Sequence, residues 1–218
     1  MTDYAAVRSN MVESQLRTNK VTDPDLLDAF MQVPRERFLP ENLQGIAYVD
    51  QDIPVGNGRF MMQPMVLARL LQAATISASD SVLDVGCGTG YCAAVLARLA
   101  STVVAVEADA GLADRAVATL TALVGTKVKV VNTPHEAGYS SRGPYDVIVL
   151  GGAVAVLPAT LTDQLAIGGR LVAVIGAPGM VAQATLVERL DAGISRRVLF
   201  DAAIQPLPGF AQERAFVF

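Results

Sequence analysis

The sequence has no tryptophan, a single histidine and only two cysteines among its 218 residues. Cys87 and Cys92 lie within one short segment, so they cannot build the disulfide framework of a small secreted protein. A zinc site needs more ligands than this pair and His135 provide at such spacing. The sequence therefore predicts no metal site.

Charge is also scarce, since charged residues make up 17% of the chain and the formal net charge is −4. No lysine or arginine cluster offers the phosphate-neutralising surface that nucleic-acid binding needs. The first twenty residues carry charged side chains where a secretory signal would be apolar, and no apolar run reaches the ~18 residues typical of a membrane span. We expect a cytoplasmic protein with neither nucleic acid nor a membrane as its partner.

Hydrophobic residues, by contrast, make up 52% of the chain, which is typical of a compact globular protein. The length favours a single domain over residues 1–218. We expect its first part, residues 1–78, to hold N-terminal helices and an active-site loop, and residues 79–218 to form an α/β core.

The N-terminal part alternates helical and loop patterns. Two short helices are predicted within residues 11–38, the second with Pro24 in its first turn. The glycines and proline of residues 53–58 predict a loop that covers or forms a site. Pro64 then begins a helix with its apolar residues on one face.

The core alternates short apolar runs with helical segments. Apolar runs that do not alternate with polar residues are typical of parallel strands buried on both faces. Because these runs are separated by helical segments along the chain, they predict a doubly wound, Rossmann-like α/β sheet. Weaker runs near the C-terminus predict antiparallel edge strands. The predicted strands are 81–85, 102–106, 127–131, 146–150 and 170–175, with edge strands at 197–200 and 214–218 and helices at 91–100 and 112–124.

A glycine-rich turn joins the first predicted core strand to the helix after it. Gly86, Gly88 and Gly90 allow the backbone to turn sharply and to approach a ligand closely. Glu107 stands at the end of the next strand, where a carboxylate can accept hydrogen bonds from both hydroxyls of a ribose. The alternative is a tight turn with Glu107 merely solvated.

The glycine spacing favours S-adenosylmethionine over a dinucleotide. The third glycine comes one residue earlier than in G-x-G-x-x-G, and Tyr91 occupies the expected place. S-adenosylmethionine has no phosphate, and Asp84 can help to hold its amino-acid part. The arrangement resembles motif I of class I methyltransferases, which implies a cofactor site that includes Asp84, Gly86, Cys87, Gly88, Gly90 and Glu107. Cys87 also has a plainer interpretation, as a small buried filler.

Nearly the whole chain, from about residue 10 onward, resembles the protein-L-isoaspartate O-methyltransferase family. The resemblance implies transfer of a methyl group from S-adenosylmethionine to an isoaspartyl carboxylate in a damaged protein or peptide. It rests on residues 11–17 (MVESQLR), 33–40 (VPRERFLP), 53–58 (IPVGNG), 144–148 (PYDVI), 168–172 (GGRLV) and 205–207 (QPL).

One departure from the family lies in its active-site loop. The family sequence is G-x-G-Q-T-I-S-Q-P, with the serine implicated at the active site, whereas here Gly58 is followed by Arg59, Phe60, Met61 and Met62. Met62 stands at the place of the serine, and a thioether cannot donate a hydrogen bond. Arg59 could pair with a substrate carboxylate, and the alternative is a solvated loop arginine.

A second departure follows the third core strand. The family has Gly-Asp-Gly there, with the aspartate on the adenine amino group, and the aligned residues are Thr133, Pro134 and His135. The resemblance places Pro134 and His135 in the cofactor site without that carboxylate. His135 could orient the substrate, or it could be a surface or packing residue.

These observations lead to one main hypothesis and two alternatives. We expect an S-adenosylmethionine-dependent O-methyltransferase whose acceptor is an isoaspartyl protein or peptide, or a changed acceptor such as a small molecule. The first alternative is an S-adenosylmethionine-binding protein that has lost catalysis and serves as a sensor or partner. The second is a nicotinamide dehydrogenase.

Overall fold

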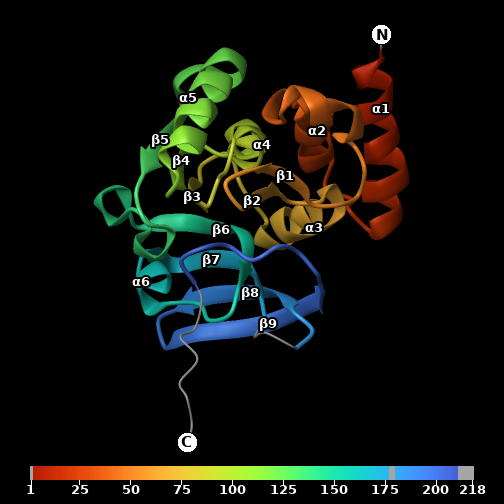
Figure 1. The fold of residues 1–218 in the computed structure, drawn as a ribbon. Coiled ribbons are helices and arrows are strands. Elements are labelled where there is room, and N and C mark those ends of the chain that lie inside the picture. Colours follow the sequence, from red (N-terminus) through yellow and green to blue (C-terminus); the bar gives the residue numbers. More distant parts are fainter. Residues whose placement is uncertain (1, 177–179, 211–218) are drawn as a thin grey trace, which may run out of the picture.

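The structure is a computed structural model that describes residues 2–176 and 180–210. A seven-stranded sheet forms its centre, in the order β5-β4-β3-β6-β7-β8-β9 (Figure 1). Strands β3 to β7 are parallel, and β8 and β9 continue the sheet in antiparallel pairing. The strands of this sheet are β3 (Ser81–Val85), β4 (Thr102–Glu107), β5 (Val128–Asn132), β6 (Tyr145–Val154), β7 (Leu165–Ile175), β8 (Gln183–Leu190) and β9 (Gly193–Asp201).

The predicted α/β sheet with antiparallel strands at its C-terminal edge is confirmed. The strand predicted at 197–200 is part of β9, and β8 was not predicted. The strand predicted at 214–218 lies outside the described residues.

Both faces of the central strands are buried, as their apolar sequence predicts. Val82 belongs to one hydrophobic cluster, with residues of α2, α3 and α4, whereas Leu83 belongs to another cluster, with Leu161 of α6 and Leu207. Because successive side chains of a strand point to opposite faces, these clusters cover the two faces of the sheet. The helices are α1 (Tyr4–Met11), α2 (Pro24–Gln32), α3 (Pro64–Ala74), α4 (Tyr91–Leu99), α5 (Ala110–Val124) and α6 (Ala159–Thr162).

The N-terminal helical segment begins earlier than predicted. Helix α1 starts at Tyr4, because the Asp3 carboxylate accepts hydrogen bonds from the backbone N–H groups of the first turn. Helical turns then continue through Asn19. Helix α2 begins with Pro24, as predicted, and the Asp23 side chain caps it.

The loop predicted at residues 53–58 is wrong in part. These residues form most of a two-stranded hairpin, β1 (Ile53–Gly56) and β2 (Arg59–Met61), which leads directly into α3 (Figure 1). The positive φ angles of Gly56, Asn57 and Gly58 make the turn, so the glycines were correctly interpreted. The strand was missed because only Ile53 and Val55 alternate with exposed positions, which is a short pattern.

Among the described residues, no helix combines the length and the apolar character needed to cross a membrane.

Gly151 of β6 provides a test of how closely the sheet packs against the glycine-rich turn. A Cβ atom at this position would overlap the backbone oxygen of Gly86. We expect Gly151→Ala to lower the free energy of unfolding by about 1–3 kcal/mol, the range for overpacking, as measured by urea denaturation. Gly45→Ala is the matched control, because a Cβ there meets nothing within 4 Å. Equal stability of the two variants would contradict this packing.

Candidate functional site

The glycine-rich turn lies at the carboxyl ends of β3 and β4. Gly86, Gly88 and Gly90 have φ angles of 79°, 57° and 98°, which other residues rarely adopt. The N–H groups of Gly86 and Cys87 both donate to the carbonyl oxygen of Val106, at 2.8 and 3.0 Å. The turn is therefore attached to β4, and its backbone faces the edge of the sheet where ligands bind in α/β folds.

Glu107 ends β4 and is fully buried. Burial by itself would raise the pKa of Glu107, but the hydrogen bond from His135 and the charge of Arg59 lower this pKa to about 2. The interpretation of Glu107 as a solvated side chain is wrong. Its Oε2 atom accepts from Gly88 N at 2.7 Å and Arg59 Nε at 3.3 Å, and its Oε1 atom accepts from Ala108 N at 3.0 Å and Asp109 N at 3.2 Å and lies 3.0 Å from His135 Nε2.

Arg59 extends from β2 into the site. Its side chain is only 3% exposed, so the interpretation as a solvated loop arginine is wrong. Besides its contact with Glu107, the guanidinium donates from Nη2 to the carbonyl oxygen of Gly86 at 2.6 Å. Arg59 thus lies across the glycine-rich turn and the carboxylate at the end of β4.

His135 lies beside Glu107 and is 2% exposed, so it is not a surface residue. Its Nδ1 atom is 2.9 Å from the carbonyl oxygen of Pro208, and a carbonyl can only accept, so Nδ1 carries a proton. The opposite nitrogen, Nε2, lies between the N–H of Ala108 and the carboxylate of Glu107. The ring therefore connects β4 to the chain that follows β9.

A cavity of about 360 Å³ opens next to His135 and Glu107. Its wall includes Pro134 and His135, which the sequence places in the cofactor site, and also Glu136, which the sequence analysis did not single out. Glu136 is exposed and follows His135 directly. The other lining residues are Ala108, Asn132, Thr133, Pro208 and Gly209.

Asp84 of β3 is a buried carboxylate, and among the described residues neither of its oxygens has a hydrogen-bond partner. Burial raises the pKa of Asp84 to about 7, although the nearby Cys92 thiol and the charge of Arg59 act in the opposite direction. An unpaired buried carboxylate is costly. Its position below the glycine-rich turn fits a ligand with a cationic amine.

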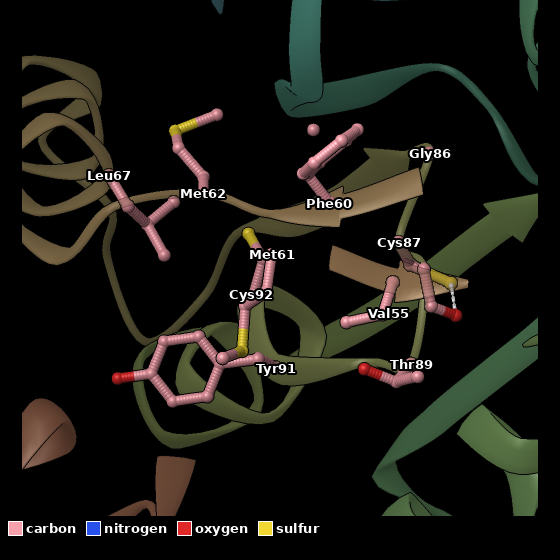
Figure 2. A pocket seen from close by; sticks show the side chains of 12 residues that line it. Val55, Phe60, Met61, Met62, Leu67, Gly86, Cys87, Thr89, Tyr91 and Cys92 are labelled. Carbon is pink, nitrogen blue, oxygen red and sulfur yellow. Dashed lines mark hydrogen bonds between the residues drawn. The ribbon is translucent and has the colours of Figure 1, made fainter. Parts of the chain in front are cut away.

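A second, smaller cavity separates the hairpin from the glycine-rich turn and α4. Figure 2 shows Phe60, Met61 and Met62 on the hairpin side of it, and Cys87 and Cys92 on the other side. The cavity measures about 30 Å³, which is room for one or two water molecules. Met62 therefore lines a mainly apolar cavity next to the glycine-rich turn.

The two thiols are not activated. Burial raises the pKa of Cys87 and of Cys92 well above the usual thiol range. A protonated thiol is a poor nucleophile, which supports the interpretation of Cys87 as a small buried residue. Within residues 2–176 and 180–210, no group of three histidine, cysteine or acidic side chains could hold a metal ion.

Arg35 positions the segment that carries Met62, a role that no sequence pattern predicts. It is completely buried and donates from Nε to the carbonyl oxygen of Ala47 at 2.7 Å and from Nη2 to that of Met62 at 2.6 Å. Its guanidinium lies 4.7 Å from the centre of the Tyr91 ring. The main chain at Met62 is thus fixed by a buried cation from the N-terminal part.

Comparison with known proteins identifies the family. The sequence model of the protein-L-isoaspartate(D-aspartate) O-methyltransferase family matches residues 7–205. A protein-L-isoaspartate O-methyltransferase from Koribacter versatilis is 39% identical over 210 residues, covering 96% of this chain and 94% of the relative. One from Rhodopseudomonas palustris strain HaA2 is 43% identical over 176 residues, covering 81% and 72%.

The chain belongs to the protein-L-isoaspartate(D-aspartate) O-methyltransferase family. It is an S-adenosylmethionine-dependent methyltransferase, as the resemblance implied, and this replaces the nicotinamide dehydrogenase alternative. The fold is that of a Plasmodium falciparum structure, which is described as such an enzyme in complex with S-adenosyl-L-homocysteine. The two structures have a TM-score of 0.80 at 19% identity, and the match covers 96% of this chain and 100% of that chain.

Asp84 allows a test of the site's electrostatics without any ligand. Because its pKa is raised to about 7 in the folded protein and is about 4 in an unfolded chain, the folded state binds more protons between these pH values. Stability should therefore fall as the pH rises from about 4 to about 7. We expect Asp84→Asn to remove much of this fall in thermal denaturation curves, whereas the exposed Asp114→Asn should keep it. An unchanged pH dependence in Asp84→Asn would contradict the unpaired carboxylate.

Proposed function

We propose that this family member transfers the methyl group of S-adenosylmethionine to the isoaspartyl carboxylate of damaged proteins or peptides. The observation that carries the proposal is the unpaired, buried Asp84 beneath the glycine-rich turn, one strand away from Glu107. The two carboxylates suit the amine and the ribose of one adenosyl amino acid. The cytoplasmic location expected from the sequence remains part of this proposal.

The chemical groups that line the site match those of this cofactor. Asp84 would hold its ammonium group, the backbone of Gly86, Cys87, Gly88 and Gly90 would lie along its amino-acid part, and Glu107 would accept from the ribose. The wider cavity beside Pro134 and His135 would take the adenine, and Glu136 would supply the carboxylate that the family has in its Gly-Asp-Gly segment. When bound, the cofactor supplies an electrophilic methyl group on a sulfonium.

The chain's contribution to the reaction is positioning and the exclusion of water. An acceptor carboxylate is already ionised near neutral pH, so no general base is needed. Phe60, Met61 and Met62 form an apolar wall that keeps water away from the reacting groups. Arg59, the cation of this hairpin, is the group of the site that can pair with a carboxylate.

The decisive experiment measures the transfer of labelled methyl groups to an isoaspartyl peptide, with the matched aspartyl peptide as control. We expect base-labile methyl ester on the isoaspartyl peptide alone. Transfer to a small molecule but to neither peptide would contradict the proposed acceptor. Cofactor binding without transfer to any acceptor would favour the alternative in which catalysis has been lost.

Met62 should limit the rate on isoaspartyl peptides. Its side chain lines the apolar cavity where the family loop has a serine, and a misplacement of ~1 Å can cost on the order of a hundredfold in rate. We expect Met62→Ser to raise kcat on the isoaspartyl peptide severalfold. Met65→Ser, a half-buried methionine of α3 that does not line this cavity, is the control. A folded Met62→Ser protein with no gain would show that the hydroxyl is not the missing group.

A further inference from the structure

Glu107 has no free acceptor site for the ribose. A carboxylate offers about four lone-pair positions, and four N–H donors already surround this one, with the His135 ring beside them. The N–H groups of Gly88, Ala108 and Asp109 belong to turns at the ends of β3 and β4 and cannot leave without remodelling them. Ribose hydroxyls must therefore replace a side-chain donor.

Of the two side chains that contact Glu107, Arg59 is the one that can move. The ring of His135 is held from its far side by the carbonyl oxygen of Pro208. Arg59 is carried by β2, which within the described chain pairs only with β1 and so lies outside the seven-stranded sheet. The hairpin tip is held to α5 by an exposed hydrogen bond of 2.8 Å from Asn57 Nδ2 to Asp109 Oδ2.

The guanidinium also covers the glycine-rich turn itself. A Cβ atom on Gly86 would lie 2.5 Å from Leu207 Cδ1 and 2.9 Å from Arg59 Nη2, so these two side chains together cover this side of the turn. Arg59 also lies beside Phe60 and Met62, at a crevice too narrow for a water molecule. It stands between the cofactor side and the acceptor side of the site.

We propose that Arg59 and the cofactor's ribose compete for Glu107, and that cofactor binding releases the Arg59 guanidinium toward the carboxylate of the acceptor. The family loop has glutamine at this place, so the competition is a property of this chain. Arg59 becomes a positioning residue that couples the two binding events. The acceptor half of this inference rests on the function proposed above, whereas the competition does not.

Calorimetry with S-adenosylhomocysteine tests the competition without any acceptor. Breaking a charge-assisted contact costs binding energy, so Arg59→Gln should bind S-adenosylhomocysteine about tenfold more tightly than the unmodified protein. Arg59→Lys keeps the charge and should show a smaller gain. Arg69→Gln is the control, because Arg69 lies over the ring of Phe200 and should leave the affinity unchanged. Unchanged or weaker binding by a folded Arg59→Gln protein would overturn the competition.

A measurement on the unmodified protein avoids any effect of substitution on folding. The Arg59 Nε–H group, buried against Glu107, should give a protected ¹⁵N resonance in the cofactor-free protein. Adding S-adenosylhomocysteine should shift this resonance and speed its exchange with water. A resonance that stays protected and unshifted at saturation would show that Arg59 remains on Glu107, against the inference.

The coupling is tested with an isoaspartyl peptide in the presence and absence of S-adenosylhomocysteine. The unmodified protein should bind the peptide much more tightly when S-adenosylhomocysteine is present, and Arg59→Gln should lose this difference. Equal peptide affinity in both conditions would overturn the coupling. If no protein binds the peptide while Arg59→Gln still binds S-adenosylhomocysteine more tightly, the proposed acceptor fails and the competition is supported.

Discussion

The ionised carboxylate of Glu107, completely buried at the end of β4, is the constraint on which the site depends. A charge in this position is stable only if donors surround it, and few of them are available within β4 itself. The hairpin supplies Arg59, and the turn after β5 supplies His135, which in turn holds the backbone at Pro208. Distant segments therefore meet at the site because one carboxylate needs their donors.

Asp84 lies on the neighbouring strand in the opposite electrostatic situation. Its register partner on β4 is Ala105, two residues before Glu107, so both carboxylates belong to the same end of the sheet. Four N–H groups donate to Glu107, whereas neither oxygen of Asp84 accepts a hydrogen bond from the described residues. This asymmetry suits a ligand that brings a cationic amine to one carboxylate and exchanges neutral hydroxyls for a donor at the other. The same asymmetry makes Arg59, close to both groups, the side chain through which cofactor and acceptor can affect one another.

The active-site loop keeps the family residues on both sides of residue 62, whereas the side chain at residue 62 itself differs. Arg35 holds the carbonyl oxygen of Met62, and the carboxylate of Asp52 accepts from the N–H groups of Gln63 and Gln205, so the main chain on both sides of the cavity is fixed. These contacts use backbone atoms and tolerate a different side chain at residue 62. The main chain of the loop can therefore keep its path when the serine hydroxyl of the family is replaced by the thioether of Met62. What is lost is a hydrogen-bonding group that could orient the acceptor.

The sequence by itself determined the α/β class of the sheet, the succession of its central strands and helices along the chain, and the family. Those features depend on local patterns: apolar runs that must be buried on both faces, Pro24 and Pro64 in first helical turns, and glycines where φ is positive. It also placed Asp84 and Glu107 correctly at the ends of adjacent strands. Only the tertiary structure decided that Arg59 is buried rather than solvated, that His135 contacts Glu107, and that Arg35 holds Met62. These contacts join residues far apart in the chain, and no local period or propensity encodes which buried donor will meet which buried carboxylate.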